Sequence, residues 1–275
     1  MNQALVAYGD QIRKIRHAVA IAVLGTIVAC GSGSAANVQN ENAPGVSKNN
    51  MGTSKSSAVR SDPAAATGEV SGVNAARVGA GARTPVVLFF GTSLTAGYGL
   101  NPDQAFPTLI EEKARAEGIA IKTVNAGLSG ETTAGAVRRI DWVLRTPADL
   151  VVIEAGANDA LRGLSTTDAK ANLEQLISAV RQRQPTAKIA LIQMEAPPNY
   201  GVAYTSSFRR IYSEVAAKEG LPLLPFLLAG VAGIPRLNQA DGVHPNLTGE
   251  KIVADNIWKG LKPLVAQLDR GAKRG

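Results

Sequence analysis

The stretch "VVLFFGTSLTAGYGL", residues 86–100, joins a wholly apolar run to a loop that carries Ser93. Five consecutive apolar residues, 86–90, are typical of a strand that is buried on both of its faces. Such strands occur in parallel sheets, whose ligands bind beyond the carboxyl ends of the strands. The stretch therefore predicts a parallel sheet with Ser93 at its functional edge.

From residue 84 onward, strand and helix patterns alternate along the chain. Further strands are expected over 119–124, 150–156, 188–194 and, more weakly, 221–227. Helices are expected over 105–118, 132–145, 168–183, 206–220 and 247–268. Strict alternation favours one α/β domain in which helices cover both faces of a parallel sheet of about five strands.

The N-terminal residues 11–30 pass from a basic stretch to an apolar core and end at a small residue and Cys30. This order is typical of a secretory signal, and the core is too short for a permanent membrane span. The end of the segment, residues 27–30, resembles the lipobox of bacterial lipoproteins, in which the cysteine becomes the lipidated first residue. An ordinary signal peptide with a chance cysteine is the alternative. Gly31, by the same resemblance, favours the outer membrane of the cell envelope, facing the periplasm.

Residues 31–83 are rich in Gly, Ser, Ala and Asn, and they offer too little apolar surface to form a core. The sequence therefore predicts a signal peptide over 1–29, a lipidated cysteine with a disordered tether over 30–83, a folded domain over 84–268 and a basic C-terminal tail over 269–275. The net charge is +7 and aromatic residues make up 4% of the chain. Without a dense basic block, we expect no nucleic acid partner.

Ser93 needs a base and a place for negative charge before it can act as a nucleophile. Taken alone it would be interpreted as a turn or cap serine, because Thr95 stands where the Gly-x-Ser-x-Gly motif has its last glycine. The chain has two histidines, and His244 is the one outside the predicted signal. Asp241 lies three residues before His244, close enough to orient the imidazole. A loop histidine beside a solvated aspartate is the alternative.

Two further polar positions follow strands and could stabilise an oxyanion. Gly130 precedes a predicted helix, where a backbone N–H can point into the site. Asn158 follows the third predicted strand and carries an amide that can donate, although an Asx turn or helix cap would use the same residue. Asp159 beside it is assigned such a structural role.

These pieces together resemble the SGNH (GDSL-type) hydrolases, in their arylesterase, thioesterase and lysophospholipase branch. The resemblance covers about residues 84–268 and rests on four ordered blocks: "GTSL" at 91–94, "LSGET" at 128–132, "GAND" at 156–159 and "DGVH" at 241–244. It implies a three-layer α/β/α, flavodoxin-like fold. It also implies Ser93 as nucleophile, His244 as base and Asp241 as its orienting acid, with an oxyanion hole from Ser93, Gly130 and Asn158. The family usually has Asp where this chain has Thr92.

The sequence is therefore expected to encode a lipid-anchored serine esterase that hydrolyses carboxylic acyl esters, with thioesters and lysophospholipids as further substrates. No metal and no cofactor is expected. Residues 194–201 are expected to line the acyl pocket, with a plain structural loop as the alternative. A carbohydrate or cell-wall O-acetylesterase and a non-catalytic lipoprotein binding module remain the rival functions.

Overall fold

The computed structural model describes residues 83–274 of the chain. The predicted signal peptide, Cys30 and the tether up to residue 82 lie outside the described residues. Five strands form one sheet in the order β2-β1-β3-β4-β5, and every neighbouring pair is parallel. They are β1 (Val86–Gly91), β2 (Lys122–Gly127), β3 (Leu150–Ile153), β4 (Lys188–Ile192) and β5 (Leu223–Leu224). The predicted α/β class and the parallel sheet are confirmed.

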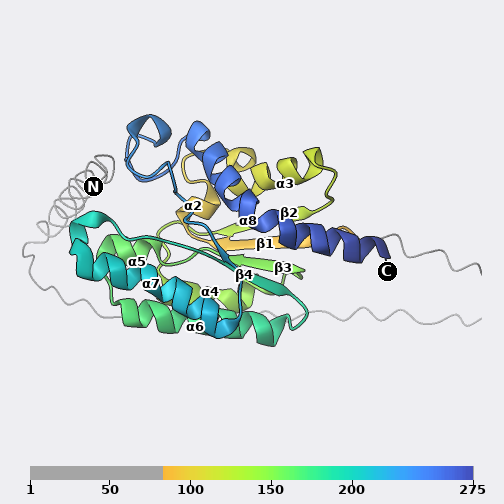
Figure 1. The fold of residues 1–275 in the computed structure, drawn as a ribbon, viewed down its shortest axis with the longest axis horizontal. Helices are drawn as coiled ribbons and strands as arrows, with labels where there is room; N and C mark the ends of the chain where they lie inside the picture. Colours follow the sequence, from red (N-terminus) through yellow and green to blue (C-terminus); the bar gives the residue numbers. More distant parts are fainter. Residues whose placement is uncertain (1–82, 275) are drawn as a thin grey trace, which may run out of the picture. The chain divides into compact units, whose positions relative to one another are not determined.

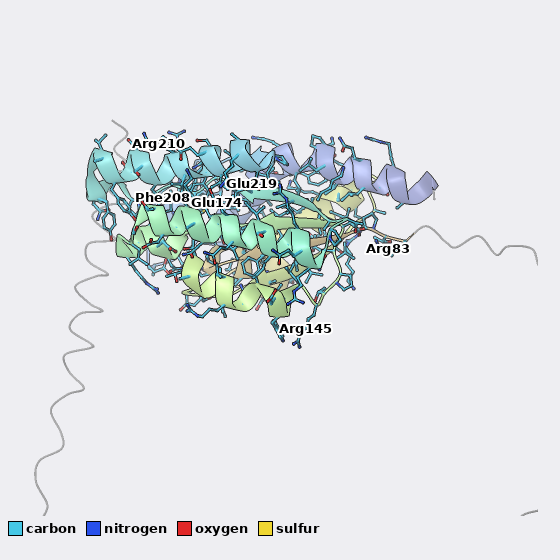
Figure 2. The ribbon with its side chains drawn as sticks, turned by 90° about the horizontal axis from the view of Figure 1, so that it is seen from below. Arg83, Arg145, Glu174, Phe208, Arg210 and Glu219 are labelled. Atoms are coloured by element: carbon cyan, nitrogen blue, oxygen red, sulfur yellow. The ribbon has the colours of Figure 1, made fainter. Side chains whose placement is uncertain are left out.

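Helices cover both faces of this sheet, which confirms the three-layer arrangement (Figure 1). One face carries α3 (Phe106–Ala116) and α8 (Leu247–Arg274). The other carries α4 (Thr133–Val143), α6 (Thr166–Arg183) and α7 (Gly201–Glu219), which lie side by side in Figure 2. Ion pairs between α6 and α7 support that layer, including Lys218 to Glu174 at 2.8 Å.

The core lies where the inner strands of the sheet, among them β1 and β3, meet both helical layers. Residues 87–90 of β1 and 150–153 of β3 are at most 1% exposed, as a strand between two layers requires. Because β1 and β3 are neighbours in a parallel sheet, the loops that follow them leave from the same edge. This arrangement brings residues 92–99 and 154–162 together at the carboxyl end of the sheet.

The element boundaries differ from the expected ones at several points. The second strand begins at Lys122, and α7 begins at Gly201, five residues before the expected start. Helix α8 continues through residues 269–274, which the sequence analysis separates as a basic tail. Asp269 is only 6% exposed, so the domain continues at least to this residue.

Two short helices and one ion pair were not expected from the sequence. Helices α2 (Ser93–Ala96) and α5 (Ala157–Arg162) span one or two turns, too few to show a helical hydrophobic period. Arg83, expected in the tether, donates to the Asp149 carboxylate at 3.0 Å and so belongs to the edge of the domain. Among residues 83–274, no helix combines the length and hydropathy that a membrane span needs.

Candidate active site

Ser93 lies directly beyond the end of β1, as the first residue of the short helix α2. The turn is tight, because a Cβ at Gly91 would stand 2.1 Å from Thr95 Oγ1. Thr92 caps the helix through its side chain, and Gly97 ends it with a φ of 69°. Ser93 is 8% exposed, and its side chain faces a pocket at the carboxyl end of the sheet.

The loop before α8 brings His244 and Asp241 to this serine. His244 Nε2 lies 2.9 Å from Ser93 Oγ, and His244 Nδ1 lies 2.7 Å from Asp241 Oδ2. The second carboxylate oxygen, Asp241 Oδ1, accepts the backbone N–H groups of Val243 and His244 at 2.9 and 3.0 Å. These backbone bonds fix the carboxylate relative to the ring, so Asp241 can hold the Nδ1–H tautomer that leaves Nε2 as the proton acceptor.

Two opposing effects act on the Asp241 carboxyl. Burial tends to raise its pKa, but the hydrogen bonds from His244 and Val243 outweigh burial and hold the pKa below its usual range. Asp241 is therefore an anion at neutral pH, and it can stabilise an imidazolium at His244.

The two other residues expected to stabilise an oxyanion line the same pocket as Ser93 and His244. Within residues 83–274, no hydrogen bond uses the backbone N–H of Ser93 or that of Gly130. Gly130 has a φ of 77°, a conformation that favours glycine. Asn158, in α5, donates one amide hydrogen to the carbonyl of Glu131 at 3.0 Å, and its second hydrogen remains for a ligand.

Asp159 has the structural role assigned to it. Its carboxylate accepts the backbone N–H of Thr133 at 2.8 Å and the Thr133 hydroxyl at 2.6 Å. Thr133 is the first residue of α4, so Asp159 accepts a backbone N–H that has no acceptor within that helix. Its negative charge also interacts favourably with the positive end of the helix dipole.

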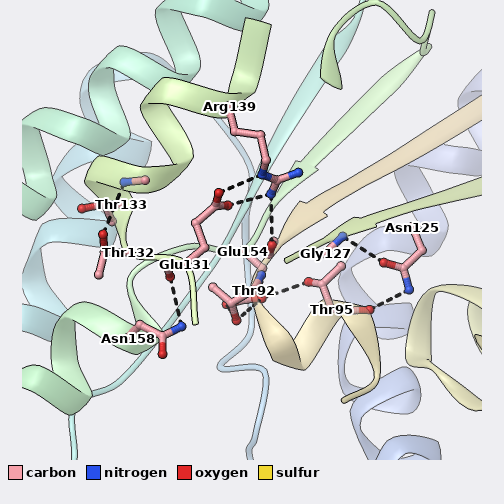
Figure 3. Close-up of polar contacts among 12 residues, drawn as sticks. Thr92, Thr95, Asn125, Gly127, Glu131, Thr132, Thr133, Arg139, Glu154 and Asn158 are labelled. Atoms are coloured by element: carbon pink, nitrogen blue, oxygen red, sulfur yellow. Dashed lines mark hydrogen bonds and ion pairs between the residues drawn. The ribbon is translucent and has the colours of Figure 1, made fainter. Parts of the chain in front are cut away.

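A buried carboxylate, Glu154, lies beneath the nucleophile loop and was missed by the sequence analysis. It accepts the backbone N–H of Thr92 at 2.8 Å and the hydroxyls of Thr92 and Thr95, each at 2.9 Å (Figure 3). Glu154 is 1% exposed, and burial raises its pKa against the hydrogen bonds from Thr92 and Thr95. An acidic residue at the end of the otherwise apolar run "LVVIEAG" was the signal that could have revealed it.

Thr92 departs from the usual family residue, and the contact with Glu154 shows what its side chain does. A threonine hydroxyl can donate to the Glu154 carboxylate, whereas an ionised aspartate at this position could only accept. A second carboxylate here would also place two like charges side by side in a buried site. The uncharged side chain of Thr92 therefore avoids charge repulsion with Glu154 beneath Ser93.

The pocket next to Ser93 is lined mainly by apolar side chains and encloses about 270 Å³. Residues 194–198 contribute to its wall, whereas 199–201 belong to a 3-10 turn and the start of α7 and do not. The Tyr98 ring, also missed by the sequence analysis, packs against the His244 imidazole with 4.6 Å between the ring centroids. The remaining apolar lining of the pocket comes from Leu94, Ala157, Leu161, Phe226, Leu228, Ala232 and Val243.

Comparisons with known proteins point to one family. The GDSL-like Lipase/Acylhydrolase family matches residues 89–252. Esterase TesA of Pseudomonas aeruginosa is 40% identical over 186 residues, which cover 67% of this chain and 91% of that protein. The Thioesterase 1/protease 1/lysophospholipase L1 of Escherichia coli is 34% identical over 185 residues, covering 67% of this chain and 86% of the relative. A crystal structure of TesA superposes with a TM-score of 0.62 at 39% identity, covering 65% of this chain and 99% of the other.

Proposed function

The chain belongs to the GDSL-like lipase/acylhydrolase family, and we propose from this premise that Ser93, His244 and Asp241 carry out its hydrolytic reaction. It is a carboxylic ester hydrolase of the SGNH type, similar to TesA, thioesterase 1 and arylesterase. The observation that carries the proposal is the continuous set of hydrogen bonds from Ser93 through His244 to Asp241.

The proposed reaction has two halves. Ser93 Oγ attacks the acyl carbonyl carbon while His244 Nε2 takes the hydroxyl proton, and Asp241 stabilises the imidazolium that forms. The imidazolium then gives this proton to the departing alkoxide, which leaves an acyl group bonded to Ser93. A water molecule next attacks the acyl carbon as His244 accepts its proton. The protonated His244 returns the proton to Ser93 Oγ, and the carboxylic acid is released.

Negative charge on the carbonyl oxygen is stabilised by three donors in this proposal. They are the backbone N–H groups of Ser93 and Gly130 and the free amide hydrogen of Asn158. Support comes from the absence of any protein acceptor for the two backbone donors within the described residues. Donors that are already in place need no reorganisation as the charge develops, which is the main electrostatic contribution to such reactions.

The pocket favours an acyl chain longer than acetyl as the bound half of the substrate. Its wall is largely apolar and includes Phe226, Leu228 and Ala232, and its volume of about 270 Å³ leaves room for more than an acetyl group. Chromogenic esters from acetyl to octanoyl test this proposal with the same alcohol throughout. We expect kcat/KM to rise with chain length up to the size of the pocket, whereas a maximum at acetyl would favour an O-acetylesterase.

A fluorophosphonate probe tests the catalytic role of Ser93 against the non-catalytic alternative. We expect a phosphonyl adduct on Ser93 by peptide mass spectrometry and no adduct in Ser93→Ala. An intact, folded protein that is not labelled would instead indicate a binding module.

We further propose that Cys30 carries the lipid that holds the enzyme in the cell envelope, at the outer membrane facing the periplasm. The support is the order of basic, apolar and small residues before Cys30. Several acyl chains are needed for stable attachment, since one chain binds membranes only weakly. Mass spectrometry of protein from the native membrane is expected to find a lipidated N-terminal Cys30. An unmodified Cys30 in a soluble mature form would contradict this proposal.

A further inference from the structure

An ion pair between Arg139 and Glu131 lies behind the proposed oxyanion hole. Arg139 Nε donates to Glu131 Oε1 at 2.8 Å, and Arg139 Nη2 donates to Oε2 at 2.6 Å (Figure 3). The two side chains are 18% and 5% exposed, so both are largely shielded from water. This two-point contact is more rigid than a single bond, because the planar guanidinium matches the carboxylate in geometry.

Arg139 also contacts the strand that ends at the nucleophile loop. Its guanidinium carbon lies 4.4 Å from the centre of the Phe90 ring. Its Nη2 approaches the carbonyl oxygen of Gly91 at 3.4 Å, two residues before Ser93. Arg139 therefore links helix α4 to the end of β1, two residues before the proposed oxyanion donor Ser93.

Glu131 connects the ion pair to the two other proposed donors. It directly follows Gly130 in the chain, and its carbonyl oxygen accepts the Asn158 amide at 3.0 Å. No atom outside its chain neighbours lies within 4 Å of the place where a Cβ of Gly130 would stand, so this side of the glycine is open. Its carbonyl oxygen accepts a hydrogen bond from Arg162 Nη2 at 3.0 Å. The polar contacts of Glu131, together with this bond from Arg162, therefore restrain this part of the loop.

We propose that the Arg139–Glu131 pair positions the donors of the oxyanion hole, with Arg139 and Glu131 acting as positioning residues. The inference rests on the proposed function, because it concerns the donors assigned to that reaction. Oxyanion donors must lie within hydrogen-bond distance of the developing charge, and an error of about 1 Å can cost about 100-fold in rate. A rigid pair that touches both loops keeps these distances constant.

Arg139→Met and Glu131→Gln test this role by removing one partner each. We expect kcat on a short chromogenic ester to fall by about 10- to 100-fold while KM stays within about twofold, because oxyanion donors act mainly in the transition state. The affinity for a trifluoromethyl ketone, which forms a tetrahedral oxyanion with the serine, should fall by a similar factor. The double variant should lose no more than the worse single variant, since both changes remove the same interaction.

Arg183→Met is the matched control. It removes the exposed ion pair between Arg183 and Asp141, which also involves helix α4. We expect this control to leave kcat and inhibitor affinity within about twofold, as exposed ion pairs contribute little. If Arg139→Met fails to fold, Arg139→Lys serves in its place, because it keeps the charge and loses the two-point geometry.

Unchanged kcat and unchanged inhibitor affinity in the Arg139 and Glu131 variants would overturn the inference. So would a loss confined to thermal stability or to KM. Failure of the proposed function is recognised separately, because Ser93→Ala would then keep its activity. An inactive Ser93→Ala together with unaffected Arg139 variants overturns the positioning role alone.

Discussion

Two carboxylates lie close to Ser93, and their surroundings give them opposite properties. Asp241 is 33% exposed, is bonded to an imidazole and has a lowered pKa. Glu154 is 1% exposed, accepts hydrogen bonds from the backbone N–H of Thr92 and the hydroxyls of Thr92 and Thr95, and has a pKa that burial raises. The same functional group thus serves as an anion beside the pocket and as a buried acceptor beneath it.

This contrast separates the groups that take part in the proposed reaction from those that hold the loop around Ser93. Groups that face the pocket can change charge during a reaction because solvent and neighbouring dipoles accommodate them. Thr92, Thr95 and Glu154 beneath Ser93 are at most 2% exposed, and their polar groups bond to one another and hold the turn of the nucleophile loop. We therefore expect substitutions at the pocket to affect turnover, and substitutions at Glu154 and its partner Thr92 to affect mainly stability.

The largest expected effect comes from removing the proton-transfer pair at the pocket. Ser93→Ala, His244→Ala and the double variant should each lower kcat by about 10⁴-fold or more and reach a similar floor, because the two residues act as one unit. Kinetics on a short chromogenic ester measure this, with circular dichroism as the folding control. Near-normal turnover in His244→Ala would show that the proposed mechanism is wrong.

The next effect in size concerns the donor at Asn158. Asn158→Ala should lower kcat by about 10²- to 10³-fold with little loss of stability, as expected for one oxyanion donor. Asn256→Ala is the matched control, because that amide on α8 donates to the Ala229 carbonyl at 2.7 Å and does not line the pocket. An equal loss of turnover in both variants would show that Asn158 does not act as an oxyanion donor.

A third carboxylate, Glu250, extends the comparison to a site with a single hydrogen bond. Burial raises the pKa of Glu250 to about 8, and one bond from the Phe106 N–H at 2.9 Å opposes that shift. Because the folded pKa is above the ordinary value of 4.5, this group's contribution to stability is complete below pH 4.5 and is lost as the pH rises through about 8.

Glu250→Gln keeps an acceptor for Phe106 and removes the ionisation. The native enzyme should lose unfolding free energy by about 1.4 kcal/mol per pH unit in that interval relative to the variant. Thermal unfolding at pH 5, 7 and 8 measures the difference, with the exposed Glu112→Gln as control. Parallel stability curves for native enzyme and Glu250→Gln would show that Glu250 does not titrate in this range.

The smallest expected effect comes from removing the hydrogen bond between Thr92 and Glu154 beneath Ser93. Thr92→Val keeps the shape of the side chain and removes one donor to Glu154, which should cost about 1–2 kcal/mol of stability. We expect kcat to fall by less than in Asn158→Ala, because Thr92 does not face the reacting atoms. Thr186→Val, at an exposed position, is the control for the substitution itself. A large loss of kcat at unchanged stability would show that Thr92 contributes to turnover and not to stability.

The long, periodic elements of this fold could be predicted from the sequence. The run 86–90 identifies a buried strand because every residue is apolar, and 168–183 identifies a helix through its spacing. Short elements could not be predicted: α2 and α5 each contain too few residues for a period, and their conformation depends on the caps and on the neighbouring strands. The start of α7 at Gly201 was missed for a related reason, since residues 201–205 carry no clear apolar face.

The pocket-facing groups were accessible to sequence analysis because each stands next to a recognisable boundary. Ser93 and Asn158 follow apolar strands, and Asp241 and His244 are close in the chain. Glu154 was missed because its partner Thr92 lies 62 residues away in the sequence. Arg139 pairs with Glu131 only eight residues away, but its contact with Gly91, 48 residues away, forms only when the chain folds.

By itself the sequence determined the parallel α/β class, the edge on which Ser93 lies and the family, because apolar runs and ordered short blocks are local properties of the chain. Only the tertiary structure decided the 2.9 Å approach of His244 to Ser93, the burial of Glu154 and the pairing of Arg139 with Glu131. The physical reason is that local propensity governs which segments become strands and helices. Distances between side chains and their exclusion from water arise only when separate segments pack together.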